Sequence, residues 1–127
     1  MTKQTDNGVP RISARSPAEV VNEQVRAYNA RDVAAFVATY AEDICIYQMP
    51  HAKLLAKGRA ALTEHYGSKI FTKLGLRAEV LSRQTIGNKV IDHELTYGLH
   101  PNPEECVVVY EVHEGLISGV WFFQIAG

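Results

Sequence analysis

The alternation of apolar and polar residues is most unusual at residues 90–97. This segment has the pattern of a β-strand, yet Asp92, His93 and Glu94 place three ionisable side chains in a row at its centre. Because successive side chains of a strand point to opposite faces, Asp92 and Glu94 share one face and His93 lies on the other. The two carboxylates are then about 7 Å apart. Their face is either solvated or the polar wall of a pocket, whereas His93 lies among apolar neighbours, as core or interface histidines do.

Three helices are predicted in the first part of the chain. Ser16 has the features of an N-cap, with proline after it and Glu19 placed to complete a capping box. Apolar residues at positions 21, 25 and 28 then form one stripe of this helix. Asp32 can cap a second helix, whose apolar face runs over residues 33–40. A third helix follows Gly58, with Leu62, Tyr66 and Ile70 on one face.

Strands dominate the rest of the chain. A short strand is expected at residues 44–49, followed by a loop over residues 50–57. Turn signals such as Gly87-Asn88 then separate four long strands, at residues 76–86, 89–99, 106–113 and 116–125. Helices followed by antiparallel strands predict an α+β fold, with the helices packed on one face of a curved sheet.

Two of these strands, at residues 106–110 and 120–123, are apolar on both faces. A sheet covered on one side by its own helices should alternate more cleanly. We therefore expect the second face to pack against another copy of the chain, as a homodimer. Residues 16–127 are expected to form one domain, preceded by a flexible arm over residues 1–15.

Charge and composition narrow the classes of partner. The formal net charge is −1 and basic residues are not clustered, so binding to nucleic acid or to an anionic membrane has no electrostatic support. The polar N-terminal segment lacks the apolar centre of a secretory signal, and a cytoplasmic protein is expected. Cys45 and Cys106 lie in apolar runs, as buried small side chains rather than a disulfide.

Motifs for a cofactor are missing from the sequence. The histidines and cysteines do not follow a His-x-x-x-His or Cys-x-x-Cys spacing, and we expect no metal site. The sequence has no Gly-rich phosphate loop, so a nucleotide cofactor is not expected either. A Gly-x-Ser-x-Gly elbow is also missing, although the sequence does not exclude a Ser-His-Asp nucleophile built from residues far apart along the chain.

Six short segments follow one another in a recognisable order and spacing, at residues 28–32, 40–43, 58–62, 87–94, 110–112 and 115–117. In these segments the chain resembles the nuclear transport factor 2-like superfamily, and within it the SnoaL-like and ketosteroid-isomerase-like branch. The resemblance covers roughly residues 17–125. It implies a cone-shaped (cystatin-like) α+β fold, with three N-terminal helices packed on a strongly bent antiparallel sheet.

The resemblance also implies positions for chemistry. Ketosteroid isomerases use a carboxylate base on the first strand, with a tyrosine on the first helix and a protonated aspartate on a later strand as oxyanion donors. These positions fall on Gln48, on Gln24, and near Val108 or Val109. A secondary pocket tyrosine of the family is matched by Tyr66. Because an amide has no useful basicity, Gln48 cannot abstract a proton, and steroid isomerisation by that mechanism is not expected.

Asp92 and His51 are the candidate catalytic bases. If the face of Asp92 lines the cone, burial raises the pKa of a carboxyl group there and makes an acid/base pair with Glu94. Otherwise these carboxylates are surface charges, or one pairs with Arg77 or Arg83 on the neighbouring strand. His51 lies in the loop where a pocket mouth is expected, and can be a base near neutral pH or simply solvated.

Six side chains are candidates for contacting a ligand: Gln24, Gln48, Tyr66, Glu94, Tyr28 and Trp121. The glutamines can orient a carbonyl or hydroxyl group, or satisfy each other or bound water. The aromatic side chains can line a cavity for a flat apolar ligand, or simply pack the core.

These observations favour a small-molecule-pocket protein of the SnoaL-like type, with an apolar, ring-containing, oxygenated ligand. If the protein is an enzyme, the implied chemistry is cofactor-free acid/base isomerisation, dehydration or cyclisation. The alternatives are a non-catalytic ligand-binding or sensing dimer of the same fold, and a protein-docking domain like the transport factor itself.

Overall fold

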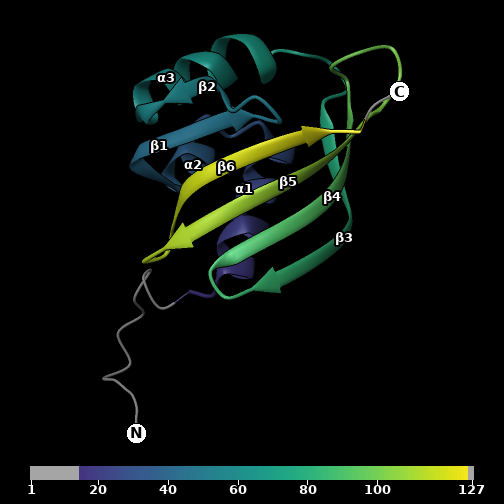
Figure 1. Cartoon of the computed structure of the whole chain (residues 1–127). Helices are drawn as coiled ribbons and strands as arrows, with labels where there is room; N and C mark the ends of the chain where they lie inside the picture. Colours follow the sequence, from purple (N-terminus) through teal and green to yellow (C-terminus); the bar gives the residue numbers. More distant parts are fainter. Residues whose placement is uncertain (1–14, 126–127) are drawn as a thin grey trace, which may run out of the picture.

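A computed structural model describes residues 15–125 as a curved six-stranded sheet with its helices on one face (Figure 1). The expected N-terminal arm therefore lies outside the described residues, apart from Arg15. Across the sheet the strands run in the order β2 (Lys53–Lys57), β1 (Tyr40–Gln48), β6 (Leu116–Gln124), β5 (Glu104–His113), β4 (Lys89–Tyr97) and β3 (Arg77–Ile86). All neighbours are antiparallel except β1 and β6, which are parallel.

The helices begin where the capping residues predict. Helix α1 (Pro17–Ala30) starts at Ser16, whose hydroxyl accepts from the backbone N–H of Glu19, and the Glu19 carboxylate accepts from the backbone N–H of Ser16. Asp32 caps α2 (Val33–Ala38). Helix α3 (Gly58–His65) continues as a π-helical turn, η2 (Tyr66–Ile70). None of the described helices is long and apolar enough to cross a membrane.

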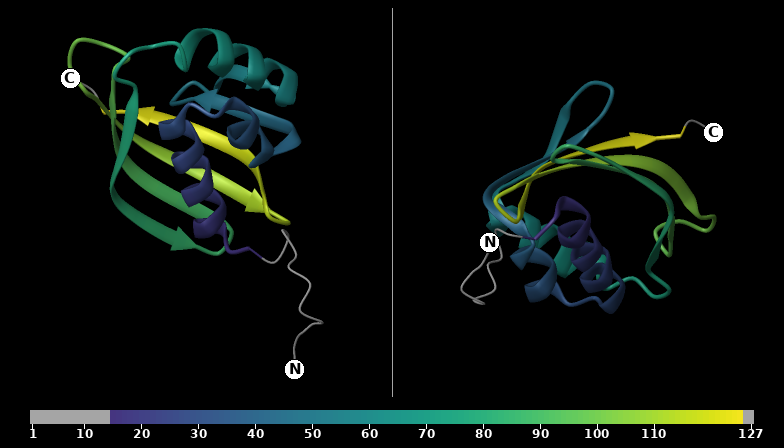
Figure 2. Two further views of the ribbon diagram at one scale, coloured as in Figure 1. Left: turned by 180° about the vertical axis from the view of Figure 1, so that it is seen from behind. Right: turned by 90° about the horizontal axis from the view of Figure 1, so that it is seen from below.

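The helices lie inside the curve of the sheet, which leaves the opposite face of the sheet uncovered (Figure 2). Between the two layers is an aromatic cluster centred on Phe36, which is fully buried. Its ring centroid lies 4.7–6.0 Å from those of four other aromatic side chains, Tyr28, Tyr40, Tyr66 and Phe71. The cluster packs α1, α2 and the π-helical turn against Tyr40 at the start of β1. The predicted α+β class, with helices on one face of a bent sheet, is confirmed.

Strand β4 has the alternation that the sequence predicts, and the structure shows which of its two faces is buried. Val90, Asp92, Glu94 and Thr96 are buried, and the residues between them are half-buried on the opposite face. The two carboxylates of β4 therefore point toward the helices and not into solvent.

Two expectations about the first strand are wrong. Tyr40 begins β1 instead of ending the second helix, which stops at Ala38. Residues 53–57, expected within a loop, form β2, which pairs antiparallel with β1. Strand β2 is a short edge strand in which only Ala56 is buried, so it shows no apolar alternation. Pairing of its backbone with β1 holds it in place.

Candidate ligand pocket

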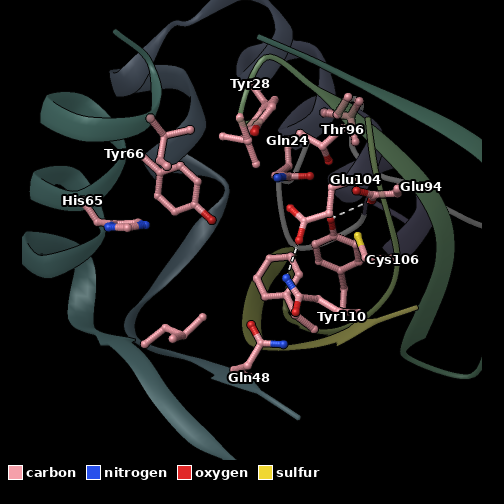
Figure 3. Close-up of a pocket in the computed structure, with 17 residues that line it drawn as sticks. Gln24, Tyr28, Gln48, His65, Tyr66, Glu94, Thr96, Glu104, Cys106 and Tyr110 are labelled. Atoms are coloured by element: carbon pink, nitrogen blue, oxygen red, sulfur yellow. Dashed lines mark hydrogen bonds between the residues drawn. The ribbon is translucent and has the colours of Figure 1, made fainter. Parts of the chain in front are cut away.

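A cavity of about 190 Å³ lies between the helices and the inner face of the sheet (Figure 3). Helix α1 supplies Gln24 and Tyr28, and the third helical segment supplies His65 and Tyr66. The sheet supplies the remaining polar lining, which is Gln48, Glu94, Thr96, Glu104, Tyr110 and Gln124. Aromatic side chains thus line the cavity from the helices and from the strands, whereas both of its carboxyl groups come from the strands.

Glu94 is the buried carboxyl group of this pocket, with an exposed fraction of 6 %. Burial, and then the charge of Asp92 nearby, raise the pKa of Glu94 to about 7. Two interactions oppose this rise: the Tyr110 hydroxyl donates to Glu94 Oε2 at 3.1 Å, and the positive charge of Arg83 acts on Glu94 from a distance. Around neutral pH this carboxyl group is therefore present in both its protonated and its ionised form.

Asp92 lies in an ion pair and is not among the residues that line the pocket. Arg83 donates to both of its carboxylate oxygens, from Nε to Oδ1 at 2.6 Å and from Nη2 to Oδ2 at 2.9 Å. Nη1 of the same arginine donates to Asn22 Oδ1 on α1 at 2.5 Å. Asp92 is fully buried, and this pair balances its charge. Of the alternatives left open for Asp92, the pairing with Arg83 is the one observed.

Gln24 points a buried acceptor into the pocket. Its Oε1 has no hydrogen-bond partner among the described residues. The residue is 6 % exposed, so bulk water does not satisfy this oxygen. The other predicted glutamine, Gln48, also lines the pocket, and its Nε2 lies 3.5 Å from the backbone oxygen of Met49.

Two of the predicted site residues lie elsewhere. His51 is exposed in the turn between β1 and β2, and it does not line the pocket. Trp121 follows the alternation of β6 onto the opposite face from Phe122, which does line the pocket. Its ring stacks on Tyr47, with centroids 6.1 Å apart. Neither side chain is placed to touch a ligand in this cavity.

The pocket also contains residues that sequence reasoning did not select. Glu104 was expected in the turn before the strand, but β5 begins with it, and it points to the same face as Cys106. Gln124 Nε2 donates to the Glu104 carboxylate. Counting back in steps of two from Tyr110 would have placed Glu104 on the pocket face, because side chains alternate along a strand.

The lining is acidic and amide-rich, with no lysine or arginine among the described lining residues. His65 is its basic side chain, and burial with the nearby charge of Lys69 lowers its pKa. Burial also raises the pKa of the Cys106 thiol to about 12, so this thiol stays protonated near neutral pH. Within residues 15–125, side chains of His, Cys, Asp and Glu do not gather in threes that could hold a metal ion.

Comparison with known proteins agrees with this architecture. Residues 21–120 match the family model of the SnoaL-like domain. No curated protein matches the sequence significantly. At identities of 19–22 %, the solved structures described next show the shared fold alone.

Three similar solved structures come from bacteria. An uncharacterised cystatin-fold protein from Novosphingobium aromaticivorans is 22 % identical, with a TM-score of 0.75 over 86 % of this chain and 98 % of that one. A protein from Kribbella flavida, provisionally called a ketosteroid isomerase, is 20 % identical, with a TM-score of 0.76 over 87 % and 78 %. A protein from Sinorhizobium meliloti, provisionally named a polyketide cyclase, is 19 % identical, with a TM-score of 0.71 over 82 % of this chain and 93 % of that one.

Proposed function

The chain belongs to the SnoaL-like family, and on that premise we propose that it is a cofactor-free acid/base enzyme acting on a small ring-containing ligand. The observation that carries the proposal is Glu94, a buried carboxyl group with a pKa of about 7 in the polar wall of an aromatic-lined cavity. A general acid or base works best when its pKa is near the working pH. This assigns to Glu94 the role that the sequence suggested for Asp92 or His51.

The proposed chemistry is a proton transfer by Glu94. Its carboxylate accepts a proton from a carbon or oxygen atom of the ligand and returns it at another position, as isomerisation, dehydration and cyclisation each require. The Tyr110 hydroxyl donates to Oε2 and so stabilises the ionised form of Glu94, which is present before the proton is accepted and again after it is returned. Gln24, Gln48 and Tyr66 line the same cavity and orient the oxygen functions of the ligand.

The size of the cavity supports a one-ring ligand. Pockets for drug-sized molecules enclose about 300–1,000 Å³, whereas an apolar cavity of about 150 Å³ holds benzene. The cavity of about 190 Å³ lies close to the second value. The walls formed by Tyr28, Tyr66 and Phe122 suit the faces and edges of a single aromatic or cyclohexenone ring.

Thermal unfolding with a panel of one-ring ketones, enols and hydroxy-ketones is the first test. A ligand at 100 times its dissociation constant should add about 2.7 kcal/mol to the stability of the folded state. Each stabilising compound is then assayed for turnover with the wild type, with Glu94→Gln and with Glu105→Gln. The last variant removes the same charge from the exposed face of β5. We expect turnover to be lost in Glu94→Gln alone, and equal turnover in Glu94→Gln would refute the assignment.

The rival function is a non-catalytic binding protein of the same fold. Gln48 favours it, because an amide stands where ketosteroid isomerases carry their base. In that case ligands would stabilise the protein without turnover at any pH from 5 to 9. Ligand binding with a pH–rate profile that follows the ionisation of Glu94 would exclude the rival.

A homodimer through the outer face of the sheet is part of the proposal. Val109 and Trp121 lie opposite each other in β5 and β6 on this face, which the helices leave uncovered. Sedimentation at micromolar concentration should give a dimer, and Val109→Glu should give a folded monomer. A monomeric wild type would contradict this part. The cytoplasmic location also stays a prediction, which the free thiols of Cys45 and Cys106 support.

A further inference from the structure

The pocket carries negative charge without a matching cation. Glu94 and Glu104 both line it, and Arg83, the described arginine whose charge acts on Glu94, already binds both carboxylate oxygens of Asp92. The lowered pKa of His65 keeps this side chain neutral at physiological pH. His100 lies outside the lining, with Nε2 3.8 Å from Glu104 Oε1 and most of its side chain in solvent. The pocket therefore attracts a ligand group that carries positive charge.

One acceptor atom in the pocket wall, Gln24 Oε1, has no hydrogen-bond donor within the described part of the chain. Gln24 Oε1 is buried in the lining and has no partner among the described residues. A buried acceptor without a donor destabilises the folded state, and a ligand with an N–H or O–H group at this point would remove that cost. This observation is independent of the two glutamates, and it asks for the same kind of ligand group, a donor.

The strand register brings the charged groups within reach of one small molecule. Glu94 lies opposite Cys106, and Thr96 lies opposite Glu104, so the two glutamates are diagonal neighbours on the inner face of β4 and β5. Such positions are about 7–8 Å apart between Cα atoms. Figure 3 shows both carboxyl groups directed into the cavity, together with the amide of Gln24.

From these observations we propose that the ligand of this pocket carries a protonated amine whose charge is met by Glu104. An N–H or O–H group of the same ligand donates to Gln24 Oε1, and Glu94 remains free for the proton transfer described above. This inference rests on the proposed function and narrows its substrate class to one-ring amines. The rings of Tyr28 and Tyr66 add cation–π attraction for such a ligand. Carboxylates and phosphates should bind more weakly than amines, because Glu104 and the ionised form of Glu94 repel them.

Three probes of equal ring size and different charge test the proposal: 2-phenylethylamine, 2-phenylethanol and 3-phenylpropionate. Their dissociation constants are measured by calorimetry at pH 8, where Glu94 is largely ionised and the amine is still protonated. We expect the amine to bind about tenfold more tightly than the alcohol, as one charge-assisted hydrogen bond provides. The carboxylate should bind least. This ranking needs no variant and therefore does not depend on how any variant folds.

Two variants locate the effect. Glu104→Gln should weaken the amine about tenfold and leave the alcohol unchanged. Glu105→Gln removes the same charge from the next residue, whose carboxylate pairs with His93 on the outer face, and should change neither affinity. Equal affinity of amine and alcohol in the wild type would overturn the amine proposal and leave the pocket function intact. Unchanged amine binding in Glu104→Gln would also overturn it. Failure of all three probes to bind would overturn both proposals.

Discussion

Replacement of Glu94 by glutamine should change how the stability of the protein depends on pH. Glutamine has nearly the same shape and stays neutral at every pH, whereas Glu94 must ionise inside the protein as the pH rises. Its pKa is about 7 in the folded protein, against an ordinary value of 4.5. At 1.36 kcal/mol per pH unit, this difference corresponds to about 3 kcal/mol.

The direction follows from which state holds the proton more tightly. The folded protein retains the proton of Glu94 up to a pH of about 7, whereas the unfolded chain loses it near 4.5. The resulting stabilisation is fully present below pH 4.5 and is lost as the pH rises through 7. In Glu94→Gln this position does not titrate, so the variant does not lose this stability as the pH rises. The stability of the variant relative to the wild type should therefore increase by about 3 kcal/mol between pH 4.5 and pH 8.

Urea denaturation followed by far-ultraviolet circular dichroism measures this difference at pH 4.5, 6, 7 and 8. The comparison between two chains cancels the contribution of every other titrating group that is unaffected by the substitution. Glu105→Gln is the matched control, because its carboxylate is on the exposed face of the neighbouring strand. A difference between Glu94→Gln and the wild type that stays constant from pH 4.5 to 8 would refute a raised pKa at Glu94, and with it the basis of the proposed chemistry.

Other substitutions test the surroundings of the pocket by urea denaturation or titration. Arg83→Met leaves the buried Asp92 carboxylate unpaired and should cost about 3–5 kcal/mol. Adding Asp92→Asn should recover part of this loss, and full additivity of the two changes would contradict the ion pair. Tyr110→Phe removes a donor to Glu94, so the pKa of Glu94 should rise in a carbon-13 NMR titration. Phe36→Ala should cost about 3–5 kcal/mol, and near-native stability would mean that the aromatic cluster does not hold the layers together.

Local patterns were sufficient for much of the fold. The start of α1 at Ser16 follows from a capping box, whose hydrogen bonds join residues only three positions apart. The hairpin between β3 and β4 follows from the Gly87-Asn88 turn signal. Strand β2 and the parallel pairing of β1 with β6 were not predictable in this way. The side chains of β2 show no alternation, and the patterns of β1 and β6 indicate strands without specifying that these two pair with each other.

The site was partly predictable. Of the eight candidate residues, Gln24, Tyr28, Gln48, Tyr66 and Glu94 line the cavity. Their positions on helix stripes and strand faces, with the family resemblance, were enough to select them. His51, Asp92 and Trp121 lie outside it. Asp92 pairs with Arg83 on the neighbouring strand. In contrast, His51 lies in an exposed turn, and Trp121 follows the alternation of β6 onto the outer face.

The sequence by itself determined which side chains share a face, because the periods of helices and strands are properties of the local backbone. It thereby placed Asp92 and Glu94 together on one side of β4. Only the tertiary structure decided that this side faces the helices, and that Arg83 from the neighbouring strand neutralises Asp92 while Glu94 is left to the cavity. Periodicity carries no information about which face is buried or which charge finds a partner. Those outcomes depend on packing and desolvation among residues that are distant along the chain.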